Sequence, residues 1–378
     1  MKIELKFLTI IVVTLLTQNL FAQKKSQLIK ANSLQVDIKV DDNLIKNAWT
    51  IVPETNPDIY TTSAKKVTFY TDIDSISFDV KSNEQYDFVI LLNGKDSANT
   101  RIVWEPSKLE ILRNAETYNY SDNRFIPKFT YQSQDNPNLK KIRNDLKLDS
   151  IAGNGNELSQ IFNLMHWVHN IVKHDGSSNN PTLKNAIDLI KTCKVENRGV
   201  NCRMMAIILN ECYLSMGIKS RYITCMPKET EFDDCHVINM VFSKDLNKWI
   251  WIDPTFDAYI MDNKGNLLGI QEVREKLIKG EPLILNADAN WNRATLQTKE
   301  HYLEYYMAKN LYRLETPIVS EYNTETWEKG KEIIYVELLP LDGIVQTPQK
   351  IESTNDNTGT KFINYKTNNP DKFWTKPE

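Results

Sequence analysis

The sequence predicts an α+β protein, in which a β-rich, sandwich-like N-terminal domain precedes a domain that packs a helix-borne cysteine on an antiparallel sheet. Three observations support this fold class. Short segments that alternate between polar and apolar residues dominate up to about residue 140. Apolar residues recur at every third or fourth position from Leu158 onward, and two strand-like runs joined by a polar turn follow at 236–255. A chain of 378 residues is long enough for two domains.

The composition excludes several classes of protein. Hydrophobic residues make up 41% of the chain and charged residues 25%, which is near the globular average and argues against disorder. The formal net charge of −3 gives no electrostatic reason to expect a nucleic acid or an anionic membrane as partner. Five cysteines are too few for a disulfide-built scaffold of this length, and their odd number predicts at least one free thiol.

The first residues predict an exported protein. A lightly positive start, an apolar run over 7–16 and a small residue at Ala22 are typical of a secretory signal peptide, which we place at 1–22. The apolar run is too short to span a bilayer, and no later segment approaches that length. We therefore expect a protein outside the cytoplasm, with no integral membrane segment after cleavage of the signal peptide.

Residues 23–140 predict a β-rich accessory domain. Alternation predicts strands at 34–40, 67–70 and 76–80. The continuous apolar run 88–92 predicts a strand that is buried on both faces. No set of residues suited to catalysis occurs there, so we interpret this domain as a scaffold or targeting domain.

Residues 150–345 predict the catalytic domain. Helical periodicity covers 158–172, and a second helix is expected at about 185–193. Later in the domain, a helical pattern occurs near 300–311 and a strand-like run at 332–336. The remaining residues, 346–378, are polar and predict a loosely held C-terminal tail.

One cysteine stands at the start of a predicted helix. Apolar positions such as Met205, Leu209 and Met216 form a helical stripe, and Gly217 closes it. Cys202 lies on this stripe in the first turn, where the helix dipole favours a thiolate. Its backbone N–H has no intrahelical acceptor, so this position supplies a nucleophile and one oxyanion donor.

The hairpin that follows predicts a histidine and a carboxylate side by side. A turn centred between Asp245 and Leu246 pairs residues whose numbers sum to 491, whereas His236 and Asp253 sum to 489. An offset of two keeps both side chains on one face of the sheet, because side chains alternate with period two. In such a set, the imidazole takes the thiol proton and the carboxylate orients the ring.

These residues resemble a transglutaminase-like core, a fold related to papain-type cysteine proteases, over about Leu158 to Tyr259. The matching features are, in order, Cys202 with Ala206, the segment 217–222, His236 at a strand start, and Trp251-Ile252-Asp253-Pro254-Thr255. The family often has glycine two residues before the cysteine, whereas Gly199 stands three before it. The resemblance implies Cys202, His236 and Asp253 as catalytic residues, a protein or peptide substrate, and no cofactor.

The reaction implied is acyl transfer from an amide, and hydrolysis and transfer to an amine both stay open. An alternative is a non-catalytic protein- or glycan-binding module on the same scaffold. A metal protein is a third hypothesis, raised by His166, His169 and His174. Because zinc needs three or four converging ligands and the third histidine lies past the helix end, we predict no metal. The other cysteines, Cys193, Cys212, Cys225 and Cys235, are interpreted as core or disulfide residues, and the oligomeric state stays open.

Overall fold

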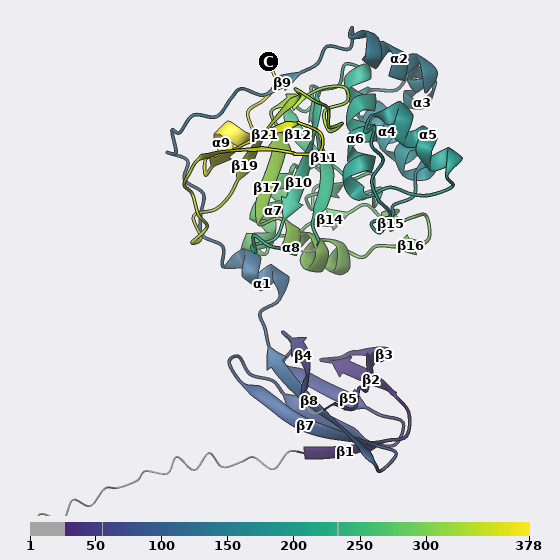
Figure 1. Ribbon diagram of the computed structural model, residues 1–378, viewed down its shortest axis with the longest axis vertical. Coiled ribbons are helices and arrows are strands. Elements are labelled where there is room, and N and C mark those ends of the chain that lie inside the picture. Colours follow the sequence, from purple (N-terminus) through teal and green to yellow (C-terminus); the bar gives the residue numbers. More distant parts are fainter. Residues whose placement is uncertain (1–26, 55, 233) are drawn as a thin grey trace, which may run out of the picture. The chain divides into compact units, whose positions relative to one another are not determined.

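The computed structural model describes residues 27–54, 56–232 and 234–378, so the predicted signal peptide at 1–22 lies outside the described residues. The chain forms two compact units that divide between Pro106 and Ser107 (Figure 1). Both strands and helices are present, which confirms the α+β class. In the described part of the chain, no helix has the length and apolar character needed to cross a bilayer.

The N-terminal unit is a sandwich of two four-stranded sheets. One sheet has the order β1-β7-β8-β4 and the other β3-β2-β5-β6. Apolar residues of both sheets form one core, which includes Ile38 and Phe69 from one sheet and Phe88 and Ile90 from the other. The strands are β1 (Gln27–Ala31), β2 (Gln35–Val40), β3 (Asn43–Thr50), β4 (Asp58–Thr62), β5 (Lys66–Tyr70), β6 (Ser75–Asp79), β7 (Gln85–Leu92) and β8 (Asp96–Trp104).

The strands predicted in this unit are present as β2, β5, β6 and β7. The expectation that the run 88–92 is buried on both faces is wrong. Phe88, Ile90 and Leu92 are buried, whereas Val89 and Leu91 are half-exposed. The strand therefore alternates, as expected for one layer of a sandwich whose outer face meets solvent.

A seven-stranded sheet forms the centre of the C-terminal unit, in the order β12-β11-β10-β17-β19-β21-β20. Neighbouring strands are antiparallel except β19 and β21, which are parallel. Its strands are β10 (Ser220–Met226), β11 (His236–Ser243), β12 (Lys248–Ile252), β17 (Arg313–Pro317), β19 (Glu332–Leu338), β20 (Lys350–Thr354) and β21 (Lys361–Thr367). Two-residue strands pair outside it: β9 (Thr130–Tyr131), β13 (Ile260–Met261), β14 (Ile284–Leu285), β15 (Asn290–Trp291), β16 (Thr295–Leu296) and β18 (Val319–Ser320).

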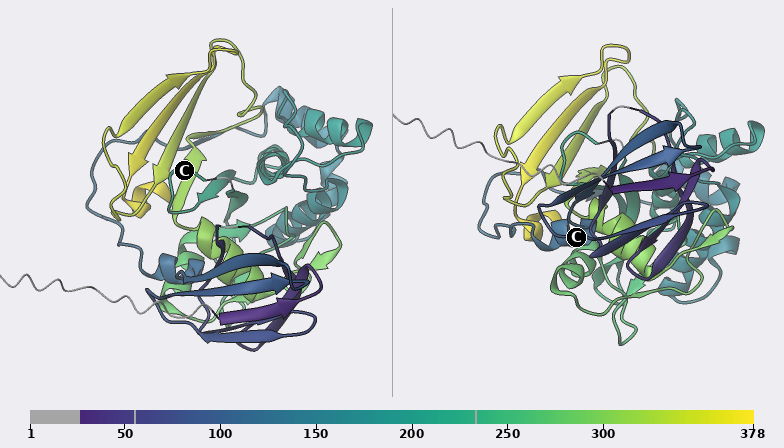
Figure 2. Two further views of the ribbon diagram at one scale, coloured as in Figure 1. Left: turned by 60° about the horizontal axis from the view of Figure 1, so that its bottom comes forward. Right: turned by 90° about the horizontal axis from the view of Figure 1, so that it is seen from below.

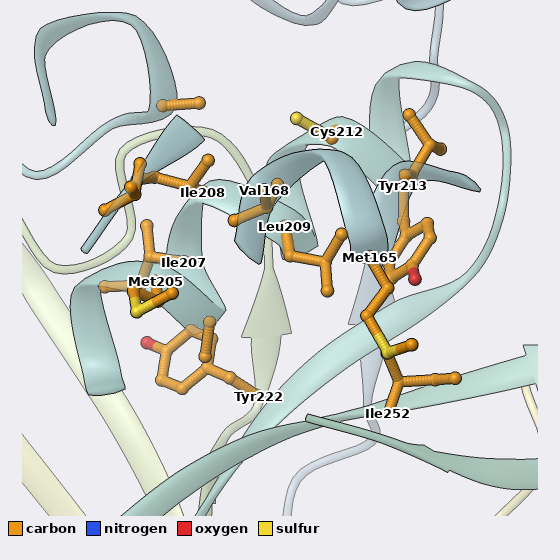
Figure 3. Packing of buried hydrophobic residues seen from close by; sticks show 14 of the residues in the cluster. Met165, Val168, Met205, Ile207, Ile208, Leu209, Cys212, Tyr213, Tyr222 and Ile252 are labelled. Atoms are coloured by element: carbon orange, nitrogen blue, oxygen red, sulfur yellow. The ribbon is translucent and has the colours of Figure 1, made fainter. Parts of the chain in front are cut away.

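Helices cover both faces of the sheet. They are α1 (Lys108–Arg113), α2 (Pro137–Asp145), α3 (Leu148–Ala152), α4 (Glu157–Ile171), α5 (Ala186–Val195), α6 (Cys202–Ser215), α7 (Ile270–Lys279), the π-helix η1 (Glu300–Met307), α8 (Ala308–Asn310) and α9 (Pro370–Phe373). On one face, α6 packs between α4 and the strands, and its Met205 and Leu209 lie in one cluster with Met165, Tyr222 and Ile252 (Figure 3). The other face packs against α1, α7 and η1. The helix that begins with Cys202 is thus fixed by a large apolar core.

The C-terminal residues are not the polar tail that we expected at 346–378. β21 pairs with β19 over seven positions, from Glu332–Lys361 to Leu338–Thr367, and β20 pairs with β21. Figure 2 shows these strands, in yellow, away from the blue-green helices α2–α6. Side chains of β20 are all exposed and those of β21 mostly half-buried, because β20 is the edge strand of the sheet and β21 lies next to it. A polar sequence is therefore compatible with strand pairing here.

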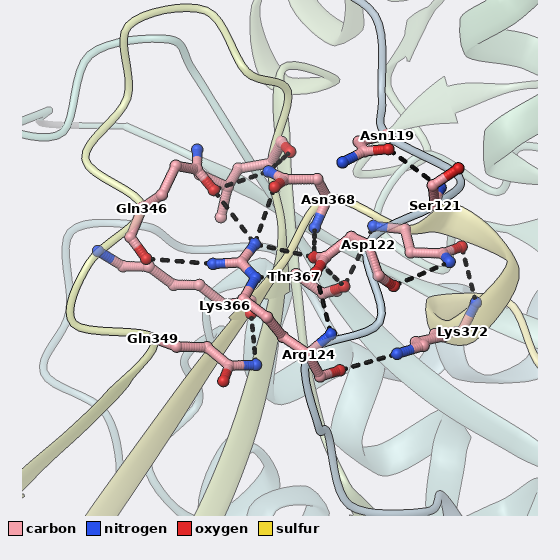
Figure 4. Close-up of polar contacts among 12 residues, drawn as sticks. Asn119, Ser121, Asp122, Arg124, Gln346, Gln349, Lys366, Thr367, Asn368 and Lys372 are labelled. Atoms are coloured by element: carbon pink, nitrogen blue, oxygen red, sulfur yellow. Dashed lines mark hydrogen bonds and ion pairs between the residues drawn. The ribbon is translucent and has the colours of Figure 1, made fainter.

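The segment between Ser107 and residue 140 belongs to the C-terminal unit, so the division lies earlier than the predicted boundary near 140. Asp122 is buried, pairs with Arg124 at 2.8 Å and accepts the backbone N–H of Asn368 at 2.9 Å (Figure 4). Arg124 also donates to the side chain of Asn368 at 2.8 Å. Burial raises the pKa of Asp122, but these hydrogen bonds outweigh it and hold the pKa far below its usual value. Long-range polar contacts of this kind leave no periodic signal in the sequence.

Candidate active site

Cys202 is the first residue of α6, as predicted. Asn201 is the N-cap, and its side chain accepts the backbone N–H of Met204 at 3.1 Å. The Cys202 side chain is 9% exposed, so it lies just below the surface. Its backbone N–H belongs to the first helical turn, whose donors have no intrahelical acceptor.

His236 and Asp253 stand at the open end of the β11–β12 hairpin. The strands pair Met240 with Trp251 and Ser243 with Lys248, which confirms the predicted register. His236 Nε2 and Asp253 Oδ2 are 2.7 Å apart, and both side chains are fully buried. Side chains alternate between the two faces along a strand, so His236 shares a face with Met240, and Asp253 shares it with Trp251. This face is covered by α7 and η1.

Cys202 is electrostatically coupled to His236, although α6 covers the opposite face of the sheet. His236 begins β11, so its ring lies at the end of the strand, beside the start of α6. Burial alone raises the pKa of Cys202, but hydrogen bonding and charge interactions with His174 and His236 outweigh it and lower the pKa to about 6. Burial likewise lowers the pKa of His236, and the charges of Asp253 and the thiolate outweigh it and raise this pKa to about 10.

The second ring nitrogen of His236, Nδ1, has no partner at normal hydrogen-bond distance among the described residues. Because Nε2 is engaged by Asp253, Nδ1 is the ring nitrogen left to interact with Cys202. Hydrogen bonds between catalytic groups are often long or poorly aligned before substrate binds. The structure thus brings the three predicted residues, Cys202, His236 and Asp253, to one place.

Sequence reasoning missed the aromatic residues around the imidazole. Tyr302 of η1 donates its hydroxyl to Asp253 Oδ2 at 2.6 Å and accepts the indole N–H of Trp251 at 3.1 Å. The rings of Phe256 and Tyr306 contact the His236 ring edge-on, with centroids 5.5 Å and 5.2 Å away. For the two tyrosines, the only sequence signal is that Tyr302 and Tyr306 stand four residues apart on one predicted helix.

Comparison with known proteins identifies the family to which part of the chain is similar. Residues 145–254 match the family model of the transglutaminase-like superfamily. The chain contains a transglutaminase-like domain. A search of curated proteins found no match. The family match identifies a fold that supports cysteine-dependent catalysis.

Two solved structures are similar in part. One is described as a "Putative Cysteine Protease" from Cytophaga hutchinsonii, with 21% identity over 31% of this chain and 37% of that one, and a TM-score of 0.25. The other is red sea bream transglutaminase, with 12% identity over 61% of this chain and 49% of that one, and a TM-score of 0.24. This chain therefore spans less than half of either of them.

All five cysteines of the chain are described, all lie in the transglutaminase-like domain, and all are free thiols. Burial raises the pKa of Cys193, Cys212 and Cys225, and it raises that of Cys235 to about 11. Cys202 alone among them has a lowered pKa. Its neighbours are therefore poor rival nucleophiles.

The three histidines considered for a metal site do not converge on one point. His169 Nδ1 lies 3.0 Å from the Pro254 carbonyl, and His174 lies beside Cys202. His166 Nδ1 contacts both carboxylate oxygens of Asp257, at 2.6 and 2.7 Å, and this ion pair raises its pKa. Asp288 is close enough to complete a three-residue group with this pair. Within this group, His166 Nδ1 is already engaged by Asp257.

A cavity of about 660 Å³ opens beside the residues that follow Cys202 in the C-terminal unit. Arg203 lines it and pairs with the buried Glu325 at 2.8 Å. Lys184 lies over the ring of Trp327, 4.1 Å from its centroid. The cavity therefore offers charged and aromatic groups, and one of them, Arg203, directly follows the candidate nucleophile in the chain.

Proposed function

We propose that this protein is an enzyme that transfers acyl groups from amide bonds, with Cys202 as nucleophile, His236 as general acid–base and Asp253 as the residue that orients His236. The observation that carries the proposal is the combination of the 2.7 Å contact between His236 and Asp253 with the lowered pKa of Cys202. The family match of residues 145–254 supports it independently.

The reaction begins with the Cys202 thiolate adding to the carbonyl carbon of the amide. The electron pair of the C=O bond moves to oxygen, and the oxyanion accepts the backbone N–H of Cys202. When this intermediate collapses, the C–N bond breaks and the amine leaves with a proton from His236. The resulting thioester then passes its acyl group to water or to an amine, and these outcomes define a peptidase or deamidase and a transglutaminase respectively.

The proposed substrate is a protein or peptide. The cavity beside Arg203 supports this class, because its charged and aromatic groups are suited to binding side chains next to an amide. We also propose that the protein is exported, which rests on the sequence of residues 1–22. N-terminal sequencing of the protein recovered outside the cytoplasm is expected to find a start just after Ala22.

The test of function is incubation of the mature protein with a peptide library, followed by mass spectrometry. Cleavage, a one-dalton deamidation or incorporation of an added amine identifies the reaction. Cys202→Ala and Asp253→Asn are expected to lose the activity, by about 10⁴-fold for the latter if Asp253 sets the tautomer of His236. His301→Ala is the control, because His301 is exposed.

A second measurement separates the enzyme from a binding module. Alkylation of Cys202 by iodoacetamide is expected to be fast in the wild type and slow in His236→Gln, which keeps a hydrogen-bonding group against Asp253. Equal and slow alkylation of both proteins would contradict the enzyme and favour a module that only binds protein or glycan.

A further inference from the structure

The segment that carries His174 lies directly beside the segment that leads into α6. Val200 donates its backbone N–H to Lys173 O at 3.1 Å, and Asp175 donates to Val200 O at 2.8 Å, so His174 and Val200 form a parallel bridge. Gly199 permits this approach, because a Cβ at that position would lie 2.4 Å from Lys173 O. Backbone hydrogen bonds therefore hold His174 beside Val200, which precedes Cys202 by two residues.

The side chain of His174 is on the same side as that of Cys202. Paired residues of two strands share a face, so His174 and Val200 point the same way. Asn201 is extended, with φ −72° and ψ 173°, so the next side chain on that face is Cys202. His174 contributes to the lowered pKa of Cys202, which agrees with this placement.

Trp291 and Asn292 fix the orientation and the tautomer of His174. Asn292 accepts the His174 backbone N–H at 2.7 Å and donates to its carbonyl at 3.0 Å. Trp291 Nε1 lies 3.4 Å from His174 Nδ1. Because an indole nitrogen only donates, Nδ1 is the acceptor and carries no proton. The proton is then on Nε2, which is the nitrogen left to donate to the Cys202 sulfur.

We propose that His174 is a further catalytic residue, whose Nε2–H is the second donor of the oxyanion hole. This proposal rests on the function proposed above. In the addition step, the new S–C bond holds the oxyanion two bonds from the sulfur, within reach of a donor that lies on the same side as the Cys202 side chain. The oxyanion accepts hydrogen bonds from the Cys202 N–H and from His174 Nε2–H until the C=O bond re-forms and the leaving group departs. No proton passes to or from His174.

The test compares two reactions of the same sulfur in the full-length protein. Acylation by p-nitrophenyl acetate passes through an oxyanion, whereas alkylation by iodoacetamide does not. Both are followed at the peptide that contains Cys202 by mass spectrometry, at a pH well above the midpoint of thiol ionisation of each variant. Cys202→Ala gives the blank, and His301→Ala is the matched control.

His174→Ala is expected to lower the acylation rate about 10²–10³-fold, as loss of one oxyanion donor does elsewhere, while alkylation changes by no more than about twofold. His174→Gln retains a side-chain N–H and is expected to recover part of the acylation rate. Trp291→Phe removes the donor that sets the tautomer of His174. It is expected to lower the acylation rate by a smaller factor than His174→Ala does.

Two results would overturn this role of His174. One is that His174→Ala acylates and alkylates at the wild-type rates, and the other is an equal fall of both rates, which indicates a structural role. If the wild type itself shows neither fast alkylation nor acylation, the proposed function fails and the role of His174 fails with it. Fast wild-type acylation that does not depend on His174 overturns the role of His174 alone.

Discussion

Each carboxylate oxygen of Asp253 accepts two hydrogen bonds in a fully buried position. Oδ2 accepts from His236 and Tyr302, and Oδ1 accepts the backbone N–H groups of Thr255 and Phe256, at 2.9 and 3.4 Å. A buried carboxylate is costly unless such partners satisfy it. These contacts therefore hold Asp253 in position to orient the imidazole.

Removal of one of these donors is expected to weaken both stability and activity. In Tyr302→Phe, Asp253 Oδ2 and the indole N–H of Trp251 each lose a partner, so the free energy of unfolding falls by about 1.5–3 kcal/mol. Urea denaturation measures this change. Tyr305→Phe on the same helix is the control, because Tyr305 is 63% exposed, and it is expected to match the wild type. Equal losses in both variants would contradict the role of the hydroxyl.

The two shifted pKa values predict the pH dependence of the site. Because the pKa of Cys202 is lowered to about 6, alkylation rises with pH around 6 and is lost below it. Amide acyl transfer also needs protonated His236, so its rate falls again as pH rises through about 10. Rates measured from pH 5 to 11 test both limbs. An alkylation midpoint near 8.5, the usual pKa of cysteine, would contradict the coupling between Cys202 and His236.

The same shift of His236 contributes to stability with a definite sign. The pKa of His236 is higher in the folded protein, about 10, than in the unfolded chain, about 6.5. Its contribution to the free energy of unfolding is therefore fully present below pH 6.5 and is lost as pH rises through about 10. His236→Gln is expected to flatten this part of a urea-denaturation profile against pH.

Three site residues were predictable from the sequence because regular elements position them. The helix start places Cys202, and the hairpin register relates His236 to Asp253. Tyr302 and His174 were not predicted as site residues, because each approaches the site from a separate segment. No local periodicity relates the path of those segments to Cys202 or Asp253.

At the scale of elements, the π-helix η1 brings two aromatic residues to the site. Tyr302 and Tyr306 contact Asp253 and His236, while Tyr305 between them is exposed. Such widened helical turns are frequent at functional sites. A helix was predicted near 300–311, but its wider turn was not, because the apolar spacing of a π-helix over eight residues resembles that of an α-helix.

The contact between the 173–175 segment and the residues before α6 depends on one glycine. Gly199→Ala would place a Cβ 2.4 Å from Lys173 O and 2.8 Å from Asp175 Cβ. The two segments must then separate, which is expected to cost about 1–3 kcal/mol of unfolding free energy and to move His174 away from the sulfur. Urea denaturation and the acylation assay measure the two effects.

Gly176→Ala is the matched control for this substitution. A Cβ on Gly176 would lie 3.6 Å from its nearest neighbour, an ordinary contact, so we expect little loss of stability. A Gly199→Ala protein as stable as the Gly176→Ala protein would show that the close approach is not required.

Two strands that escaped prediction, β20 and β21, lie at one end of the large sheet, with β20 as the edge strand. β10, β11 and β12 are almost entirely buried, so their apolar and alternating sequences indicate strands. β20 is exposed and β21 is mostly half-buried, and both carry many polar side chains. Composition alone cannot separate such strands from a tail, because what holds them is backbone pairing with β19.

At the scale of the whole molecule, each unit has its own apolar core. The core of the N-terminal unit is formed by its two sheets. The core of the C-terminal unit consists of two apolar clusters, one on each face of the seven-stranded sheet. All residues of the candidate site lie in the C-terminal unit. A fragment of residues 107–378 is therefore expected to fold alone and to react with iodoacetamide at the rate of the full chain.

Removal of residues 346–378 from this fragment is expected to have the opposite result. It deletes β20, β21 and α9, and it exposes Arg221, whose guanidinium donates to Phe373 O at 2.6 Å and lies 4.0 Å from the Phe129 ring centroid. Asp122 and Arg124 also lose their contacts with Asn368. Circular dichroism and the solubility of the shorter fragment measure the effect, and we expect loss of the cooperative unfolding transition. A shorter fragment that melts like residues 107–378 would mean that the pairing of β21 with β19 contributes little, and the C-terminal residues would then behave as the tail that their composition predicts.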